Sequence, residues 1–324
     1  MLSSDANQFV YMDSPCSERG YPMTNHRRPI LVLGATGRQG GSVAKALLKA
    51  GWNVRALVRD PIHPVSAALR EQDVELVRGS LDDTDILAAA MKDAYGVFSV
   101  LPSDLSAEDE VRYGTSIADL AVASNVDHFI YSSGASVGDK PTGVPRFDAK
   151  PRIEAHIRTL PLTATIVRPP IFMEMLVRPG FGLDQGRLTS LIRPDHSMQL
   201  IAVDDIGKIV AALFSDKSRF AGTTIRIAGD RITGHQLESA LTQAAGRPIA
   251  YARFPDEVLA ANTDLAHMAS SLENGPLAEP VDLNLMRELN PELLSFRSWL
   301  AGLDRKALDA AFGRNGEADQ STRL

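Results

Sequence analysis

The sequence predicts an α/β fold in which a doubly wound parallel sheet carries a smaller C-terminal α/β lobe. Short apolar segments alternate with segments of helical spacing from residue 29 to residue 168, which is the rhythm of βαβ units. A glycine-rich turn joins the first apolar segment to the first helix. The length of 324 residues suits two domains, or one large domain with an appended lobe.

The first half of the chain alternates between expected strands and expected helices. Ile30–Leu33 is wholly apolar, as is typical of a strand buried on both faces of a parallel sheet. Further strands are expected at 53–58, 74–77, 95–101, 128–132 and 163–167. The helices between them are expected at 42–50, 63–71, 82–92, 107–124 and 150–158. Right-handed crossovers place such strands parallel in one sheet.

Local signals support individual helix boundaries. Val43, Ala46 and Leu47 have the spacing of one helical face, and Gly51 stands where a left-handed cap commonly ends a helix. Asp82 is an acidic residue at the start of the third expected helix, where it favours the helix dipole. These signals define the first three βα units.

The rhythm changes after residue 170. Residues 171–197 contain Pro, Gly and Met and predict loops with a short helix. The remaining expected elements are a helix at 203–213, a strand at 223–227, a helix at 234–245 with Thr233 as its N-cap, a strand at 249–254 and three helical stretches ending near Phe312. We therefore expect a dinucleotide-binding domain at 29–170 and a smaller lobe at 171–312, with 204–213 packing back on the sheet. Residues 1–28 and 313–324 predict a disordered and a frayed tail.

Composition and charge exclude several classes of protein. The 34 Lys and Arg against 40 Asp and Glu give a net charge of −6, which disfavours direct nucleic-acid binding. The single cysteine, Cys16, excludes an internal disulfide or a cysteine-cluster metal site, and no metal site is expected. The chain has neither an apolar run of membrane-spanning length nor a secretory signal, so a cytoplasmic location is expected. A homodimer is compatible with these features.

The glycine motif at 34–40 is the strongest single signal for a ligand. Gly34 allows a sharp turn off the strand, Gly37 allows a pyrophosphate to approach the backbone, and Gly40 allows close packing of helix and strand. The exposed N–H groups and the helix dipole then favour a diphosphate. The alternative is a tight turn whose glycines serve packing alone. The expected cofactor-binding residues here are Gly34, Thr36, Gly37, Arg38, Gln39 and Gly40.

The end of the second strand indicates which dinucleotide is bound. Arg59 stands where a cation would meet a 2′-phosphate, and Arg38 could join it or stack on adenine. This pair favours NADP(H) over NAD(H). Asp60 keeps the alternative open, because a shift of one residue would exchange the two roles; both arginines could also be solvated surface charges.

Two further loops follow strands and are therefore expected at the same edge of the sheet. Gly79, Ser80 and Leu81 would border the adenine, and Leu101 and Pro102 would line the path to the nicotinamide ribose. Either segment could equally be an ordinary connection between a strand and a helix.

The motif Gly34-Ala35-Thr36-Gly37-Arg38-Gln39-Gly40-Gly41 resembles that of the NmrA-like family, atypical members of the short-chain dehydrogenase/reductase superfamily. Further segments agree with the family, namely Arg146–Lys150, Thr165–Pro169, Phe172–Glu174, Val203–Gly207 and Leu294–Leu300. The resemblance covers residues 29–312 and implies a Rossmann-type fold with bound NADP(H). It implies one of two functions: a reductase acting on quinones, dyes, or unsaturated or carbonyl compounds, or a redox sensor that regulates a protein partner.

The resemblance also raises the question of catalytic residues. Active superfamily members carry a Tyr-x-x-x-Lys pair in which the phenol transfers a proton to the substrate. Lys150 matches the lysine, which in the superfamily lowers the pKa of the tyrosine and holds the ribose, so the resemblance implies that Lys150 also binds the cofactor. Arg146 occupies the tyrosine position and Gly134 the position of the superfamily serine. Lys150 is also expected at a helix start, against the dipole, which favours a functional role over a solvated lysine. The candidates for replacement chemistry are Ser133, Ser136, Tyr113 and His156, of which Tyr113 and His156 could be ordinary structural residues.

Residues 169–176 are largely apolar and predict one wall of a cleft that takes a flat, hydrophobic molecule, the alternative being plain core. The first hypothesis is an NADPH-dependent oxidoreductase of a hydrophobic carbonyl, quinone or enone. The second is a dinucleotide-sensing regulator of a protein partner. The apolar wall favours the enzyme, to which we incline, and the changes at Arg146 and Gly134 favour the regulator.

Overall fold

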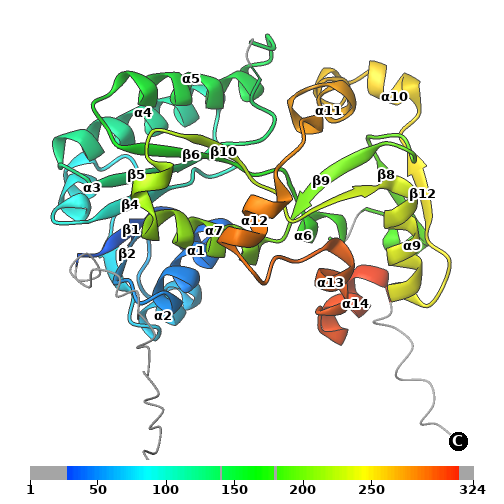
Figure 1. The fold of residues 1–324 in the computed structure, drawn as a ribbon, viewed down its shortest axis with the longest axis horizontal. Helices are drawn as coiled ribbons and strands as arrows, with labels where there is room; N and C mark the ends of the chain where they lie inside the picture. The colour runs from blue at the N-terminus through cyan, green and yellow to red at the C-terminus, as the bar shows by residue number, and fades with distance from the viewer. Residues whose placement is uncertain (1–27, 139–140, 179–180, 314–324) are drawn as a thin grey trace, which may run out of the picture.

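A seven-stranded parallel sheet forms the centre of the molecule (Figure 1). The computed structural model describes residues 28–138, 141–178 and 181–313, so Cys16 and nearly all of both expected tails lie outside the described residues. The strand order is β10-β6-β5-β4-β1-β2-β3. Among the described residues, no helix has both the length and the apolar character needed to cross a membrane.

The six expected strands of the sheet are confirmed, with small differences at their ends. The sheet consists of β1 (Ile30–Val32), β2 (Val54–Val58), β3 (Glu75–Arg78), β4 (Gly96–Ser99), β5 (His128–Ser132), β6 (Ala164–Arg168) and β10 (Thr224–Arg226). The seventh strand, β10, comes from the segment that we expected in the smaller lobe, and it pairs in parallel with β6. Because β1 lies between β2 and β4, the direction of winding reverses there and leaves a crevice at the carboxyl ends of the strands.

Helices cover both faces of this sheet. One side carries α3 (Thr84–Met91), α4 (Ala107–Ala123) and α5 (Pro145–Thr159), and the other carries α1 (Arg38–Lys49), α2 (Pro64–Arg70) and α7 (Val203–Ser215), followed by α8 (Lys217–Phe220). A separate apolar core lies on each face. The sheet is therefore a buried middle layer whose strand ends remain available for a site.

The returning helix α7 packs tightly on α1 and on the sheet. A Cβ placed on Gly207 of α7 would lie 2.4 Å from the carbonyl oxygen of Ser42 in α1. A Cβ placed on Gly96 of β4 would lie 2.5 Å from the ring of Phe214. Residues far apart in the sequence thus form one continuous core beneath the glycine-rich loop.

The start of α5 differs from the expectation. The helix begins at Pro145, where the missing N–H of proline costs nothing, and it continues through Pro151. Lys150 therefore lies within the helix and not at its first turn, so the expected conflict with the helix dipole is wrong. The proline at 151 obscured the helical pattern on its N-terminal side.

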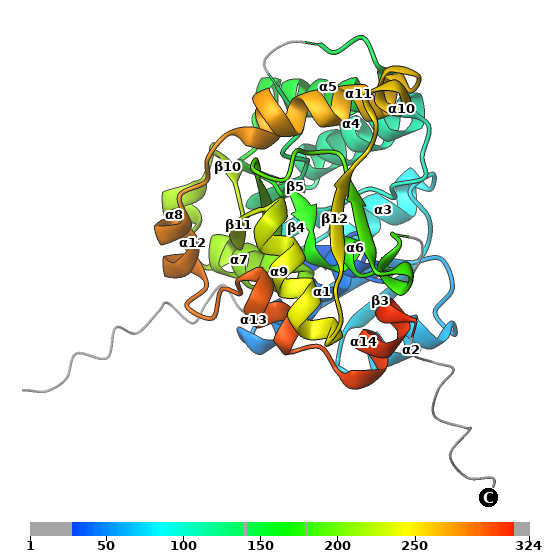
Figure 2. The same ribbon diagram turned by 90° about the vertical axis from the view of Figure 1, so that its right-hand side faces the viewer.

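The second lobe contains more regular structure than the sequence suggested (Figure 2). The expected loop region at 171–197 contains β7 (Ile171–Phe172), α6 (Met173–Leu176), a 3-10 turn at Leu183–Gln185, β8 (Arg187–Ser190) and the start of β9 (Ser197–Ile201). The expected helix and strand at 234–254 are confirmed as α9 (Gly234–Ala245) and β12 (Ala250–Arg253), and Thr233 caps α9 through a capping box with Gln236. Two small sheets, β11-β9-β7 with β11 at Asp230–Thr233, and β12-β8, organise the lobe.

The last part of the chain contains five α-helices within the described residues, not three helical stretches. They are α10 (Asp256–Ala260), α11 (Thr263–Asn274), α12 (Leu283–Leu289), α13 (Phe296–Ala301) and α14 (Arg305–Phe312), with a 3-10 turn at Pro276–Ala278. Asp205 of α7, which is fully buried, accepts hydrogen bonds from Asn290 Nδ2 (2.7 Å) and from the Leu294 N–H (3.0 Å). The Asp205 carboxylate thus links the segment between α12 and α13 to helix α7.

Candidate functional site

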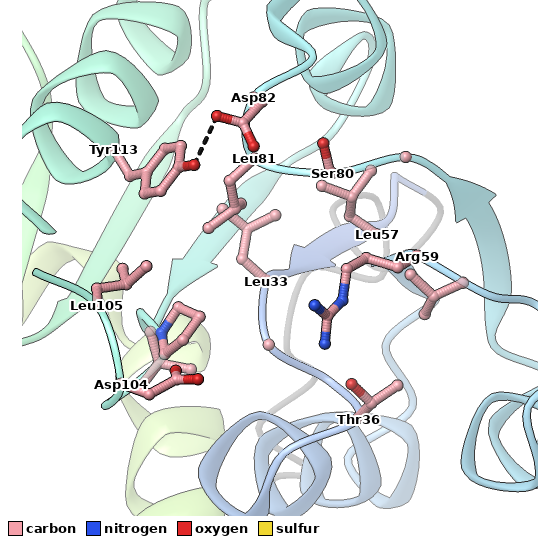
Figure 3. Close-up of a pocket in the computed structure, with 15 residues that line it drawn as sticks. Leu33, Thr36, Leu57, Arg59, Ser80, Leu81, Asp82, Asp104, Leu105 and Tyr113 are labelled. Carbon is pink, nitrogen blue, oxygen red and sulfur yellow. Dashed lines mark hydrogen bonds between the residues drawn. The ribbon is translucent and has the colours of Figure 1, made fainter. Parts of the chain in front are cut away.

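A pocket of about 280 Å³ lies at the carboxyl ends of β1, β2, β3 and β4, and we call it the loop pocket (Figure 3). Four consecutive strand-to-helix connections and one helix contribute to it. Its lining is Leu33, Gly34, Thr36, Leu57, Val58, Arg59, Gly79, Ser80, Leu81, Asp82, Val100, Pro102, Asp104, Leu105 and Tyr113. The loop pocket thus occupies the crevice that the reversal of winding at β1 creates.

The glycine-rich turn has the geometry that the motif predicts. Gly34 has a φ of +73°, a backbone conformation that side chains with a Cβ rarely adopt. A Cβ placed on Gly40 would lie 2.2 Å from the Gly34 carbonyl oxygen, so only glycine allows α1 to begin this close to the turn. Gly37 is the extended N-cap residue of α1, and the first turn of α1 contains no acidic side chain. The start of the helix therefore suits an anionic group such as a diphosphate.

Replacing Gly40 with alanine should lower the free energy of unfolding by about 1–3 kcal/mol, because the new methyl group meets backbone atoms that cannot move aside without separating α1 from β1. Thermal or urea unfolding measures the change. The matched control is Gly302→Ala, where the nearest atom lies 3.4 Å from the new Cβ and little change is expected. Equal stability of the two variants would contradict this account of the turn.

Arg59, and not Asp60, lines the loop pocket. Figure 3 shows the Arg59 guanidinium between Leu33 and Thr36. The Asp60 carboxylate instead accepts a hydrogen bond from the Ile62 N–H at 3.0 Å, which commits it to its own turn. The shift of one residue that would exchange their roles does not occur in this structure.

The far end of the loop pocket is marked by a tyrosine and a carboxylate. The Tyr113 hydroxyl donates a hydrogen bond to Asp82 Oδ1 at 2.5 Å, and the Arg112 guanidinium lies 4.1 Å from the centre of the Tyr113 ring. The hydrogen bond to Asp82 raises the pKa of Tyr113 above its usual value. Tyr113, which we expected as a replacement acid, therefore belongs to the lining of this pocket and has its hydroxyl bonded to Asp82.

The remaining expected cofactor-binding residues divide into two groups. Gly79, Ser80, Leu81 and Pro102 line the loop pocket, whereas Leu101 packs against the apolar core beside it. Arg38 is exposed and is not among the lining residues. Lining residues that the sequence reasoning missed include Asp104 and Leu105, although the rule that ligands sit at the carboxyl ends of strands could have found both.

The two serines at the end of β5, Ser132 and Ser133, point in opposite directions, as successive residues of a strand do. The Ser132 hydroxyl donates to Gln39 Oε1 in the glycine-rich loop at 2.7 Å. The Ser133 hydroxyl donates to the buried Glu154 at 2.6 Å. Ser133, one of the expected catalytic candidates, therefore has its hydroxyl directed into the interior. Ser132 is the serine that faces the glycine-rich loop.

Glu154 organises a buried ionic cluster under the loop that follows β5. Its carboxylate also accepts hydrogen bonds from Arg168 at 2.6 Å and 2.9 Å and from Arg158 at 2.7 Å. Burial opposes the charge, but the hydrogen bonds from Arg168 and Ser133 hold the pKa of Glu154 below its usual value. Arg168 and Arg226 also donate to backbone carbonyls of this loop, including that of Val137. The loop is thus held in place by two arginines.

Lys150 lies beside Gly134 at the loop that follows β5. A Cβ placed on Gly134 would lie 3.5 Å from Lys150 Cδ and 3.7 Å from Ser136 Oγ. The Lys150 ammonium forms an ion pair with Glu110 of α4. The structure therefore brings Lys150, Gly134 and Ser136 together, and a Cβ at 134 would meet only ordinary contact distances. His156, further along α5, is bonded to Asp119 at 2.7 Å.

A second cavity, which we call the apolar pocket, has a volume of about 390 Å³ and lies between the start of α5 and the second lobe. Part of the expected apolar wall lines it. Its lining is Arg146, Phe147, Ile171, Met175, Leu176, Phe181, Leu188, Thr189, Ser190, Leu191, Met198, Phe254, Asp264, Leu265, Met268 and Leu272. Arg146, at the tyrosine position, pairs with Asp264 at 2.9 Å.

The described residues contain no cluster of side chains suited to a metal ion.

The sequence and the fold of this chain are similar to those of known proteins. A model of the NmrA-like family matches residues 26–297. The NmrA-like family domain-containing oxidoreductase hkm9 of Aspergillus hancockii is 31% identical over 245 residues, covering 68% of this chain and 73% of that protein. The crystal structure of NmrA, a negative transcriptional regulator, in complex with NADP is similar with a TM-score of 0.71 and 21% identity, covering 89% of this chain and 98% of NmrA. Triphenylmethane reductase of Citrobacter sp., solved with NADP(H), gives a TM-score of 0.69 and 17% identity over 84% of this chain and 99% of the reductase.

Proposed function

Because this chain belongs to the NmrA-like family, we propose that it binds NADP(H) in the loop pocket and reduces a hydrophobic carbonyl, quinone or enone compound. When bound, the reduced nicotinamide supplies the hydride. The backbone of Gly34 and Gly37 would hold the diphosphate and Arg59 the 2′-phosphate, while Gly40 allows α1 to start close to the turn. The fit rests on the absence of an acidic side chain in the first turn of α1 and on the Arg59 cation in the loop pocket.

One observation carries the enzymatic half of the proposal. A single helix, α5, brings Lys150 to Gly134 at the loop after β5 and, one turn earlier, brings Phe147 into the wall of the apolar pocket. A molecule in the apolar pocket would therefore extend toward the proton-bearing side chains Lys150 and Ser136. These side chains would orient the reacting oxygen of the substrate and exclude water from it.

The proposal is tested by identifying the nucleotide that the purified protein retains and by following NADPH oxidation at 340 nm with a naphthoquinone, a cyclic enone and an aromatic aldehyde. We expect NADPH to bind and at least one acceptor to be reduced. Tight NADPH binding without oxidation by any acceptor would contradict the enzymatic half, and absence of nucleotide binding would contradict both halves.

Arg59→Ala should weaken NADPH binding by about 1–3 kcal/mol and leave NADH binding nearly unchanged, because only the 2′-phosphate requires the cation. Titration of intrinsic or nucleotide fluorescence measures both affinities. Arg78→Ala is the matched control, since Arg78 is an exposed arginine at the end of β3 that does not line the loop pocket. Equal weakening of both nucleotides by Arg59→Ala would show that the 2′-phosphate is bound elsewhere.

A second candidate function is a dinucleotide-sensing regulator that acts through a protein partner. The observation in its favour is that Arg146 is paired with Asp264, Gly134 carries no hydroxyl, and the Ser133 hydroxyl is bonded to Glu154. The structurally similar NmrA is a negative transcriptional regulator. This function predicts a set of captured proteins that differs between NADP⁺ and NADPH, and an identical set with and without nucleotide would exclude it.

A further inference from the structure

We propose that the apolar pocket takes an amphipathic anion, and that Arg146 binds the anionic group of this ligand after displacing Asp264. This inference rests on the proposed function, because it names the class of molecule that would enter the substrate side of the same site. It starts from an ion pair at a cavity whose other walls are almost entirely apolar. Both charged side chains belong to the lining of the cavity.

The ion pair is built so that Arg146 can exchange its partner. Its side chains remain 67% exposed at Arg146 and 40% exposed at Asp264, so solvent screens their attraction and the pair is weak. Among the described residues, the Arg146 guanidinium donates one hydrogen bond, from Nη1 to Asp264 Oδ2. A planar guanidinium has donors for a bidentate contact with a carboxylate, sulfonate or enolate oxygen. The ion pair between Arg146 and Asp264 is therefore weak enough for a ligand anion to take the place of Asp264.

The positions of the two residues in their helices decide the sign of the ligand charge. Asp264 lies in the first turn of α11, where the helix dipole stabilises a carboxylate that has lost its partner. Arg146 lies in the first turn of α5, where the same dipole disfavours an unpaired cation. An anionic ligand leaves Arg146 paired and Asp264 stabilised, whereas a cationic ligand would leave Arg146 unpaired at the positive end of α5. The geometry thus favours an anion.

The neighbouring groups support the same sign. Phe147, which follows Arg146 and lines the pocket, packs against His267 of α11 with the rings tilted by 36° and their centres 4.6 Å apart. The nearby carboxylate of Asp148 is already bonded to the N–H groups of Thr142 and Gly143, at 2.7 Å and 2.9 Å. A ligand anion therefore meets one exchangeable carboxylate, that of Asp264, and an aromatic surface against which its apolar part can pack.

The chemical consequence is a preference among the proposed acceptors. A guanidinium remains protonated and cannot replace tyrosine as a proton donor, but it can hold a stable anion. The phenol group of a hydroquinone is of the same chemical type as that of tyrosine, whose pKa is about 10, and its conjugate base is a phenolate that a guanidinium can bind. An apolar molecule whose oxygen carries or acquires such a charge fits the pocket better than a simple ketone.

The test uses two fluorescent probes with the same aromatic skeleton. The first, 8-anilino-1-naphthalenesulfonate, is an amphipathic anion, and the second, N-phenyl-1-naphthylamine, is uncharged. Both are titrated into the full chain in saturating NADP⁺ and again without nucleotide, so that binding in the loop pocket is recognised by competition. Thermal unfolding of each variant is measured alongside, because partly unfolded protein also binds the anionic probe.

We expect Arg146→Gln to weaken the anionic probe by about ten- to hundredfold and to leave the neutral probe unchanged. Asp264→Asn should strengthen the anionic probe by up to about fivefold, because it removes the competing carboxylate. The matched control is Arg305→Gln, which removes a cation of similar charge from an exposed ion pair with Asp309 on α14. An equal effect of Arg146→Gln on both probes, or an equal effect of Arg305→Gln on the anion, would overturn the inference. Because probe binding needs no turnover, the probe titrations test this inference even if the protein does not oxidise NADPH.

Discussion

Glu154→Gln should lower the free energy of unfolding by about 3–5 kcal/mol, the largest loss that we expect from a single substitution in this chain. The carboxylate is fully buried and is bonded to Ser133, Arg158 and Arg168. Its removal leaves the guanidinium of Arg168, whose side chain is 14% exposed, without its counter-charge. Urea unfolding followed by circular dichroism gives the change directly.

The control for this prediction is Glu288→Gln, which breaks an exposed ion pair with Arg219 and should cost at most about 1 kcal/mol. The pH dependence gives a second check. Because the folded-state pKa of Glu154 lies below its usual 4.5, the charged carboxylate contributes stability above that pH, and the contribution is lost as the pH falls toward the folded-state pKa. The difference between wild type and Glu154→Gln should therefore narrow as the pH falls below 4.5. A constant difference would contradict the ionic account.

Lys150→Met should reduce NADPH-dependent turnover by about a hundredfold, if the proposed reductase activity is found. Lys150 lies beside Gly134 and Ser136, and Arg146 at the tyrosine position cannot give up a proton. The loss of the ammonium would remove the group best placed to polarise the substrate oxygen. Steady-state kinetics with the best acceptor measures the effect on kcat, and a separate titration measures NADPH affinity.

Lys208→Met is the matched control for Lys150→Met. The Lys208 side chain is 32% exposed against 31% for Lys150, and it pairs with Glu292 at 2.9 Å. Lys208 also lies 3.9 Å from the buried carboxylate of Asp205, so Lys208→Met should lower stability at least as much as Lys150→Met does. Only Lys150→Met should lose turnover; an equal loss in both variants would show that the effect is structural.

The first half of the fold followed from the sequence because its signals agree with one another. The apolar strand at 30–32, the glycines at 34, 37 and 40 and the start of α1 all require the same tight turn, and the structure contains it. The start of α5 could not be placed in the same way. The helix contains Pro151 in its interior and starts five residues before the segment expected to be helical, although a proline within a helix removes one backbone hydrogen bond.

The site was predictable where it depends on strand ends and unpredictable where it depends on side-chain direction. The residues after β2 and β3 line the loop pocket because all parallel strands end at one edge. Whether Ser132 or Ser133 faces that edge depends on a register of one residue, which periodicity alone does not fix in a strand buried on both faces. The pairing of Arg146 with Asp264 joins residues far apart in the chain and has no local sequence signal.

The late arrival of β10 and α7 has a consequence for how the protein is made. A ribosome delivers the glycine-rich loop and α1 long before the strand at 224–226 and the helix at 203–215 that complete their sheet and core. During translation, at roughly 5–20 residues per second, the apolar face of α1 is without its partner for about 8–33 seconds. A nascent chain of this type should depend on chaperones that cover such a face. The first βα units, although they contain the cofactor motif, should not become protease-resistant until the later helix has left the ribosome.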